Sequence, residues 1–196
     1  MLASQLPEAP RIALVRHARS AHVHTGWIDA AGFRAWREAY EAAGIQEGER
    51  VPEPLETLAG RAGLVVASDA PRAVATARLL VPGREIVVSP LLREMDLLSP
   101  DLGRLRIPLL AWAFAVGGRI LVETIRRHYP PAAEEERVAN AVDWLASLAL
   151  RQGLVIAVTH ASLRRRLSDR LLQGGWQAEP GRRSLRHWST WNFRLR

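Results

Sequence analysis

Four short apolar runs of the sequence are each followed by residues that could bind a phosphate group or react with it. These residues are Arg16 and His17 after run 12–15, Arg72 shortly after run 64–67, Glu94 after run 86–88, and His160 after run 154–158. Guanidinium groups bind phosphate oxygens in pairs, and a neutral imidazole can attack phosphorus. A carboxylic acid can protonate the leaving oxygen. The set therefore indicates phosphoryl chemistry, and it needs no metal if the arginines neutralise the charge.

Each of these residues also has an ordinary structural explanation when taken alone. An arginine–histidine pair after a strand is a common capped loop, Arg72 on a helix can be solvated, and His160 can cap the helix that follows it. Glu94 is the weakest of the set, because Asp96 and Asp101 lie in the same polar loop. The functional interpretation rests on the fact that all of these residues follow apolar runs of the same predicted sheet.

The elements that must position these residues follow from the apolar pattern. The runs 12–15, 64–67, 86–88 and 154–158 do not alternate, which is typical of strands buried on both faces of a parallel sheet. Helical spacing predicts helices over 32–43, 71–80, 134–150 and 162–172, the first capped by Asp29 and the second by Ser68 and Asp69. We expect a three-layer α/β/α fold with a mostly parallel central sheet. The carboxyl ends of its strands meet at one edge, where ligands bind in such folds.

Length and composition limit the alternatives. The chain has 196 residues, 48% of them apolar, which predicts a single domain over 1–196, with 99–130 as a cap or an insertion. Segments 51–54 and 99–108 are expected to be irregular. All 27 basic residues are arginine, and the net charge is +7. We attribute this charge to a general preference for arginine over lysine, so no nucleic-acid partner is expected. The absence of cysteine excludes disulfides and thiolate chemistry.

The most apolar segment, 107–122, is interrupted by Gly117, Gly118 and Arg119. It falls short of the roughly 20 residues that span a bilayer, so we expect a buried or cleft-lining helix and no membrane partner. No export signal is visible near the N-terminus, and a cytoplasmic location is the default expectation. The oligomeric state is not indicated by the sequence.

Four blocks of the sequence resemble the histidine phosphatase superfamily, the phosphoglycerate mutase-like clan. The stretch 14–20, Leu-Val-Arg-His-Ala-Arg-Ser, resembles its Arg-His-Gly signature loop, and 68–77 resembles its Ser-x-x-x-Arg-Ala-x-x-Thr-Ala block. Residues 92–94 are similar to the block with the acid, and 158–161 to the late Val-x-His-Gly block. The order and spacing agree from residue 12 to about 172. The resemblance implies a phosphoglycerate mutase-like fold.

The resemblance also implies roles for individual residues. His17 would accept the phosphoryl group, and Glu94 would donate a proton to the leaving group. Arg16, Arg72 and His160 would form the phosphate pocket, and His160 would be a catalytic residue together with His17 and Glu94. Ser20 would add a hydroxyl contact to the phosphate. Members of the family work without a metal or another cofactor.

Departures from the family pattern narrow the function. Ala18 and Ala161 stand where glycine is usual, and an expected asparagine after the signature is missing. The glycine and second glutamate that normally follow the acid are not evident in 95–102, which disfavours a mutase. We expect a metal-independent phosphomonoester hydrolase that acts on a small phosphorylated substrate through a phosphohistidine on His17. The alternatives are a non-catalytic phosphate-binding protein and, less favoured, a phosphoglycerate mutase.

Overall fold

The computed structural model describes residues 9–23, 26–96, 98–181 and 183–196. Its strands are β1 (Arg11–Arg16), β2 (Trp27–Ile28), β3 (Leu64–Ser68), β4 (Val87–Ser89), β5 (Ile107–Pro108), β6 (Leu154–Thr159), β7 (Gln177–Ala178) and β8 (Thr190–Arg194). Its helices are α1 (Ala30–Ala42), α2 (Glu53–Gly60), α3 (Pro71–Leu80), the short 3-10 helix η1 (Pro90–Leu92), α4 (Leu109–Ile125), α5 (Ala132–Gln152) and α6 (Ala161–Gln173).

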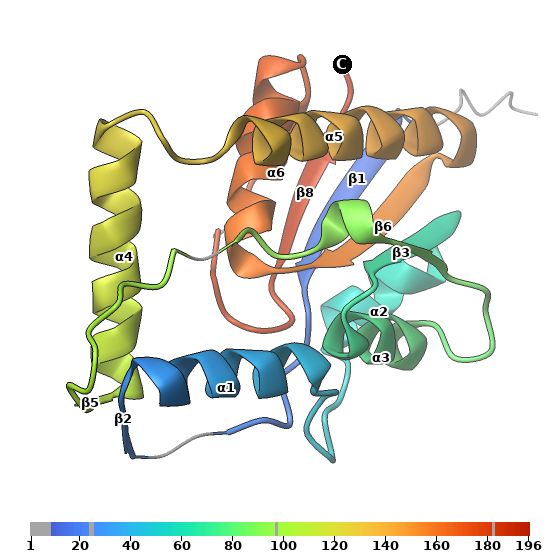
Figure 1. Ribbon diagram of the computed structural model, residues 1–196. Coiled ribbons are helices and arrows are strands. Elements are labelled where there is room, and N and C mark those ends of the chain that lie inside the picture. The colour runs from blue at the N-terminus through green and yellow to red at the C-terminus, as the bar shows by residue number, and fades with distance from the viewer. Residues whose placement is uncertain (1–8, 24–25, 97, 182) are drawn as a thin grey trace, which may run out of the picture.

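The main sheet has the strand order β4-β3-β6-β1-β8-β7. Strands β1, β3, β4 and β6 are parallel, whereas β8 runs antiparallel to both β1 and β7. Helices α5 and α6 cover one face of this sheet and α2 and α3 cover the other (Figure 1). The predicted three-layer fold with a mostly parallel sheet is therefore confirmed.

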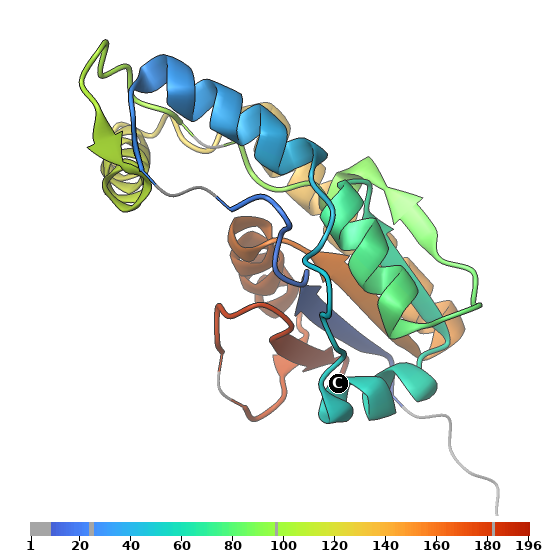
Figure 2. The same cartoon turned by 90° about the horizontal axis from the view of Figure 1, so that it is seen from below.

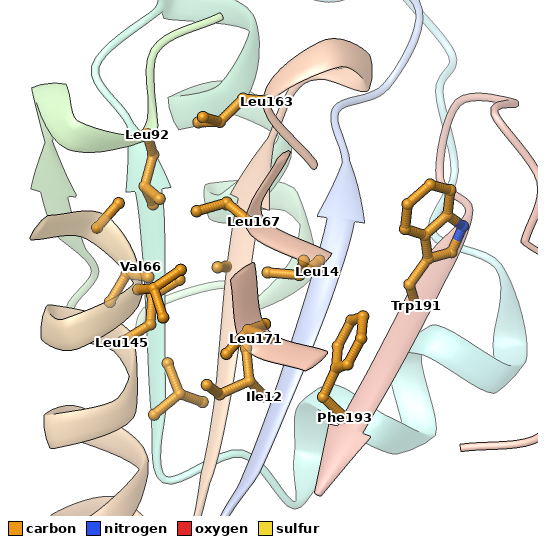
Figure 3. Close-up of a cluster of buried hydrophobic side chains, with 14 of the residues drawn as sticks. Ile12, Leu14, Val66, Leu92, Leu145, Leu163, Leu167, Leu171, Trp191 and Phe193 are labelled. Carbon is orange, nitrogen blue, oxygen red and sulfur yellow. The ribbon is translucent and has the colours of Figure 1, made fainter. Parts of the chain in front are cut away.

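Successive side chains of the central strands enter two different cores. Ile12 and Leu14 point into the core beneath α5 and α6, while Ala13 and Val15 point into the core beneath α2 and α3. Figure 3 shows the first of these cores, with Leu163 and its helical neighbours packed on the sheet. Because both faces of β1 are buried, its sequence is continuously apolar rather than alternating.

Most predicted helices form close to their expected limits, with one difference in capping. Helix α1 begins after Asp29, whose Oδ1 accepts a hydrogen bond from the Gly32 N–H at 2.9 Å, as predicted. The predicted Ser68–Asp69 cap of α3 is wrong, because the cap position is Ala70 and no side chain caps it. Ser68 Oγ instead accepts the Ala70 N–H at 3.3 Å, so the serine fixes the turn before the helix.

Two other expectations are corrected by the structure. The segment 51–54 was expected to be irregular, but α2 begins at Glu53, because Pro52 and Pro54 suit the start of a helix. The run 86–88 was expected to be buried on both faces, yet Val87 and Val88 of β4 are 38% and 44% exposed. Strand β4 lies at the edge of the sheet, where the covering helices reach it less fully.

The segment that contains α4 stands away from the main sheet (Figures 1 and 2). The N-terminal part of α4 meets α1, where Trp112 and Val116 pack with Ala30 and Phe33 in a third, small core. Much of the rest of α4 is exposed, so the helix expected in 107–122 is only partly buried. Within the described residues, the helices are all too short or too polar to cross a membrane.

Candidate active site

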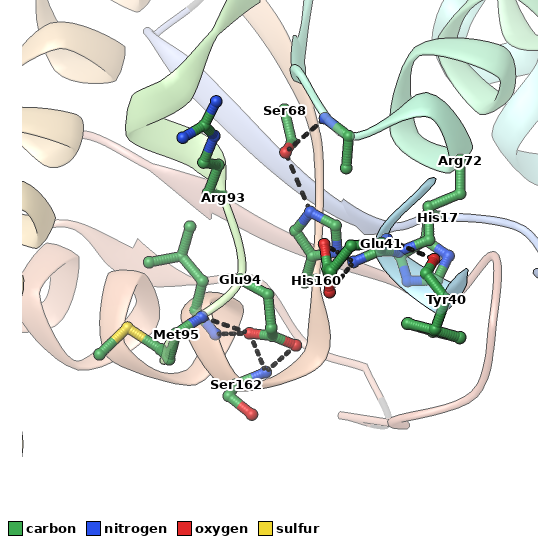
Figure 4. Close-up of polar contacts among 12 residues, drawn as sticks. His17, Tyr40, Glu41, Ser68, Arg72, Arg93, Glu94, Met95, His160 and Ser162 are labelled. Carbon is green, nitrogen blue, oxygen red and sulfur yellow. Dashed lines mark hydrogen bonds and ion pairs between the residues drawn. The ribbon is translucent and has the colours of Figure 1, made fainter. Parts of the chain in front are cut away.

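Arg16, His17, Arg72 and His160, here called the arginine–histidine cluster, come together at the carboxyl edge of the sheet. Both imidazoles are buried, and their ring centroids are 5.1 Å apart. Arg72 Nη2 donates a hydrogen bond to His160 Nδ1 at 3.2 Å, and Figure 4 shows the two rings beside this guanidinium. Arg16 is close enough to act electrostatically on both imidazoles and on Arg72. The convergence expected from the strand order is thus present in the structure.

The loop after β1 fixes the orientation of the His17 ring. The backbone carbonyl of Ala18 lies 2.6 Å from His17 Nδ1 and can only accept, so Nδ1 carries the proton. Nε2 is then unprotonated and holds a lone pair. The Ala18 N–H donates to Thr76 Oγ1 at 2.9 Å, and Thr76 Oγ1 donates to the Arg72 carbonyl at 2.6 Å. Thr76 thereby ties the loop to α3.

Burial keeps His17 neutral. Desolvation, strengthened by the charges of Arg72 and Arg16, lowers the pKa of His17 from 6.5 to about 3, although the hydrogen bond to Ala18 acts in the opposite direction. A group that must attack with its lone pair needs this neutral form. The environment therefore keeps the Nε2 lone pair of His17 unprotonated at neutral pH.

His160 is held in the other tautomer. Its Nδ1 accepts from Arg72, and its Nε2 donates to Ser68 Oγ at 3.0 Å. Burial, together with the charge of Arg72, lowers the pKa of His160 well below its ordinary value. In this arrangement His160 is a neutral ring that positions the Arg72 guanidinium.

Glu94 lies at the N-terminus of α6, beside the arginine–histidine cluster (Figure 4). Its Oε1 accepts the backbone N–H groups of Met95, Ser162 and Leu163 at 3.0, 3.1 and 2.9 Å. Oε2 has only a longer contact of 3.3 Å with the Ser162 N–H. Glu94 thus caps the N-terminus of α6 mainly through Oε1, and Oε2 is the oxygen with fewer contacts.

Asp69 is another carboxylate on this edge of the sheet. Both of its oxygens accept hydrogen bonds from Arg93, and these bonds lower the pKa of Asp69. A carboxylate fixed in its charged form by an arginine is a poor proton donor. The two carboxylates thus differ in their partners, because Asp69 is paired with the Arg93 guanidinium and Glu94 with backbone N–H groups.

Ser20 lies next to the cluster rather than inside its hydrogen-bond network. Its Oγ accepts the His22 N–H at 3.2 Å, and the side chain lines a cavity that also includes Tyr40 and His187. The hydrogen bonds described for Ser20 do not join it to the cluster.

Three residues at the site were not predicted from the sequence. Arg72 Nη2 donates to both oxygens of Glu41, at 3.1 and 3.2 Å, and its guanidinium lies 4.5 Å from the centre of the Tyr40 ring. His187 lies 5.4 Å from His17, ring centre to ring centre, and its Nδ1 is 3.1 Å from the His17 carbonyl oxygen. Their positions depend on how α1 and the segment before β8 fold onto the sheet, which no local motif indicates.

The alanines that replace the usual glycines are not strained. Among the described residues, the non-glycine residues with positive φ are Arg127 and Trp188, so Ala18 and Ala161 have ordinary backbone angles. The Cβ atoms of these two alanines therefore carry no left-handed strain at the site.

A polar cavity of about 390 Å³ opens beside Glu94 and Glu41. Its wall also includes Asp69, Arg93 and Arg37. In the described part of the chain, no group of three or more histidine, aspartate or glutamate side chains is placed to hold a metal ion. The groups available for chemistry here are imidazoles, guanidiniums and carboxylates.

Comparison with known proteins identifies the same fold in solved structures. No protein-family model matches the sequence, and no curated protein matches it. Mycobacterial hydrolase 2 is 22% identical, with a TM-score of 0.57 over 84% of this chain and 73% of that one. Mycobacterial hydrolase 1 is 22% identical, with a TM-score of 0.55 over 85% and 82%. Mycobacterial glucosyl-3-phosphoglycerate phosphatase in complex with VO3 is 24% identical, with a TM-score of 0.56 over 84% and 83%.

These similarities establish the architecture of the chain. The similar structures are of the phosphoglycerate mutase-like kind, the fold that the four sequence blocks imply. The chain therefore has a phosphoglycerate mutase-like fold, with the arginine–histidine cluster at the carboxyl edge of its sheet.

Proposed function

We propose that the protein is a phosphomonoester hydrolase that works through a phosphohistidine on His17. The observation that carries the proposal is the free Nε2 of His17 in a pocket with two guanidinium groups and a second imidazole. Fixed cationic donors stabilise the charge that spreads over the equatorial oxygens during phosphoryl transfer. The mechanism uses only side chains of this chain and requires no cofactor.

In the first step, the phosphate group of a small substrate binds between Arg16 and Arg72. It takes over the Arg72 donors that Glu41 now occupies. His17 Nε2 attacks phosphorus, forming a P–N bond as the P–O bond to the alcohol breaks. Glu94 Oε2 gives its proton to the departing oxygen, so the alcohol leaves neutral.

In the second step, water takes the place of the alcohol. Glu94, now a carboxylate, accepts a proton from the water as its oxygen attacks phosphorus. The P–N bond breaks, its electron pair returns to His17 Nε2, and inorganic phosphate leaves. Both side chains are then restored for another turnover.

Ser20 is proposed as a further phosphate contact and His160 as the group that orients Arg72. The VO3 complex of the similar mycobacterial phosphatase supports an oxyanion site in this fold.

The alternative of a non-catalytic phosphate-binding protein loses part of its basis. It was motivated by Ala18 and Ala161, and neither has strained backbone angles. The mutase alternative gains no specific contact from the structure. A phosphatase assay separates the hydrolase from the non-catalytic protein, and a coupled assay with phosphoglycerate tests the mutase alternative.

The test is hydrolysis of p-nitrophenyl phosphate in the presence of EDTA. We expect activity in the wild-type protein and a loss of at least about a thousandfold in His17→Ala. The control variant His128→Ala should show no loss, because the His128 side chain is 72% exposed in the turn after α4. Wild-type protein mixed rapidly with a ³²P-labelled phosphomonoester should also carry an acid-labile label that His17→Ala lacks. Equal rates in wild type and His17→Ala would contradict the proposal, whereas binding of phosphate with no turnover would support the non-catalytic alternative.

A further inference from the structure

Two neighbouring cavities lie along α1, and the first of them is next to the arginine–histidine cluster. A first cavity of about 300 Å³ is lined by Ser20, Tyr40 and His187, which adjoin the cluster. A second cavity of about 700 Å³, here called the α1–α4 groove, lies between α1 and α4. The two cavities share Trp36 and Leu109 in their walls, so they adjoin each other at these two side chains.

A row of aromatic rings lies beside these two cavities. Tyr40, under the Arg72 guanidinium, stacks on Trp36 with ring centres 5.2 Å apart. Trp36 stacks on Phe33 at 5.8 Å, and Phe33 stacks on Trp112 of α4 at 4.5 Å. Because Phe33, Trp36 and Tyr40 are spaced three and four residues apart, they lie on one side of α1. This side therefore connects the cationic end of the row to its apolar end.

The wall that α4 contributes is entirely apolar. It consists of one helical face, at spacings of one, three and four residues: Leu109, Leu110, Ala113, Val116, Gly117 and Ile120. Leu110 remains 71% exposed, although it lines the groove. An apolar ligand in the groove would cover this surface, which is otherwise left in contact with water.

We propose that the substrate is a phosphomonoester of an alcohol that carries an apolar chain, with the phosphate at His17 and the chain in the α1–α4 groove. This inference rests on the proposed phosphatase activity and adds the substrate class. The segment 99–130 then acts as the cap that binds the leaving group. The groove adjoins the cavity that Tyr40 and His187 line beside the cluster, and this is the reason for assigning it to substrate rather than to a protein partner.

The test compares straight-chain alkyl phosphates from ethyl to decyl, each below its micelle-forming concentration, by release of inorganic phosphate. Full burial of one methylene corresponds to about a fourfold change in binding, so we expect kcat/KM to rise about two- to fourfold per methylene until the groove is filled. The rise should come mainly from KM.

Two neighbouring glycines of α4 provide a matched pair of variants. Gly117 lines the groove and Gly118 does not, yet both are exposed and a Cβ at either meets no atom within 4 Å. Gly117→Glu should remove the dependence on chain length, because it places a charge in the groove. Gly118→Glu should retain it and should hydrolyse p-nitrophenyl phosphate at the wild-type rate.

The outcomes separate this inference from the activity on which it rests. If p-nitrophenyl phosphate is not hydrolysed, the proposed function is wrong. If it is hydrolysed but kcat/KM does not change with chain length, the substrate class is wrong. The inference is also overturned if light scattering shows a dimer that Gly117→Glu dissociates, with no dependence on chain length, because the groove would then be covered by a second copy of the chain.

Discussion

The buried, neutral state of His17 has a measurable consequence for stability at acid pH. The pKa of this imidazole falls from 6.5 to about 3 on folding, so between these values the unfolded chain binds a proton that the folded chain does not. Stability therefore decreases as the pH falls below 6.5, and the His17 contribution vanishes above it. Between pH 7.5 and pH 5, the His17 contribution to the free energy of unfolding should fall by about 2 kcal/mol.

The measurement is urea denaturation at the two pH values for wild type and for His17→Gln. Glutamine cannot titrate, so the variant should lose about 2 kcal/mol less than the wild type when the pH is lowered. Burial also lowers the pKa values of His160 and His187, but both residues are present in both proteins, so their contributions cancel in the comparison.

A control is available on the surface. The His128 side chain is 72% exposed, and His128→Gln should change the stability at pH 7.5 by no more than about 0.5 kcal/mol. If wild type and His17→Gln lost equal stability between pH 7.5 and pH 5, then His17 would not be desolvated as the structure requires. The argument that burial prepares its lone pair for attack would fail with it.

Three further substitutions test other contacts of the site and the fold. Glu41→Gln removes a carboxylate that competes with phosphate for its arginine, so inhibition by inorganic phosphate should tighten about two- to fivefold, measured as Ki with p-nitrophenyl phosphate. Thr76→Val leaves the buried Ala18 N–H without its acceptor and should destabilise the protein by about 1–3 kcal/mol in urea denaturation. In Gly63→Ala, the new Cβ would lie 2.2 Å from the Gln152 carbonyl oxygen, which should cost about 1–3 kcal/mol and lower the melting temperature. An unchanged Ki in Glu41→Gln, an unchanged denaturation midpoint in Thr76→Val or an unchanged melting temperature in Gly63→Ala would contradict the contact that the substitution tests.

The central strands and their flanking helices were predictable because their sequences show burial directly. Strands β1, β3 and β6 are buried on both faces and read as continuous apolar runs, and the helices between them show apolar residues at helical spacing. Since parallel strands bring their carboxyl ends to one edge, the convergence of Arg16, His17, Arg72 and His160 followed from the order of elements alone.

The strands at the edge of the sheet were harder to predict. Strand β8 buries Trp191 and Phe193 and leaves the residues between them less buried, an alternation that is visible in the sequence but covers only five residues. Strand β7 has two residues, and β4 is half-exposed. Short strands of this kind are fixed by pairing with a neighbour, so their own residues carry little signal.

The side of the site formed by Tyr40, Glu41 and His187 could not be predicted for a different reason. Tyr40 fits the apolar spacing of a helix, and its place beneath Arg72 depends on where α1 lies relative to α3. His187 reaches His17 because the segment before β8 is held by the buried guanidinium of Arg164, which donates to the Ser184 carbonyl at 2.7 Å. Such contacts between distant segments leave no pattern in the sequence.

Helix α1 joins the chemistry of the site to the choice of substrate. Its C-terminal end presents Tyr40 and Glu41 to Arg72, and its middle presents Trp36 and Phe33 to the groove. A phosphate that displaces Glu41 from the arginine and a chain that covers the aromatic row would therefore act on the same rigid element. Under the proposed mechanism, binding of the apolar chain would hold α1 in place while Glu41 releases Arg72. The alkyl phosphate series and Glu41→Gln therefore probe two ends of one helix. If α1 does not move during binding, Glu41→Gln should change kcat/KM by the same factor for short and long alkyl phosphates. If α1 moves, the factor should depend on the chain length.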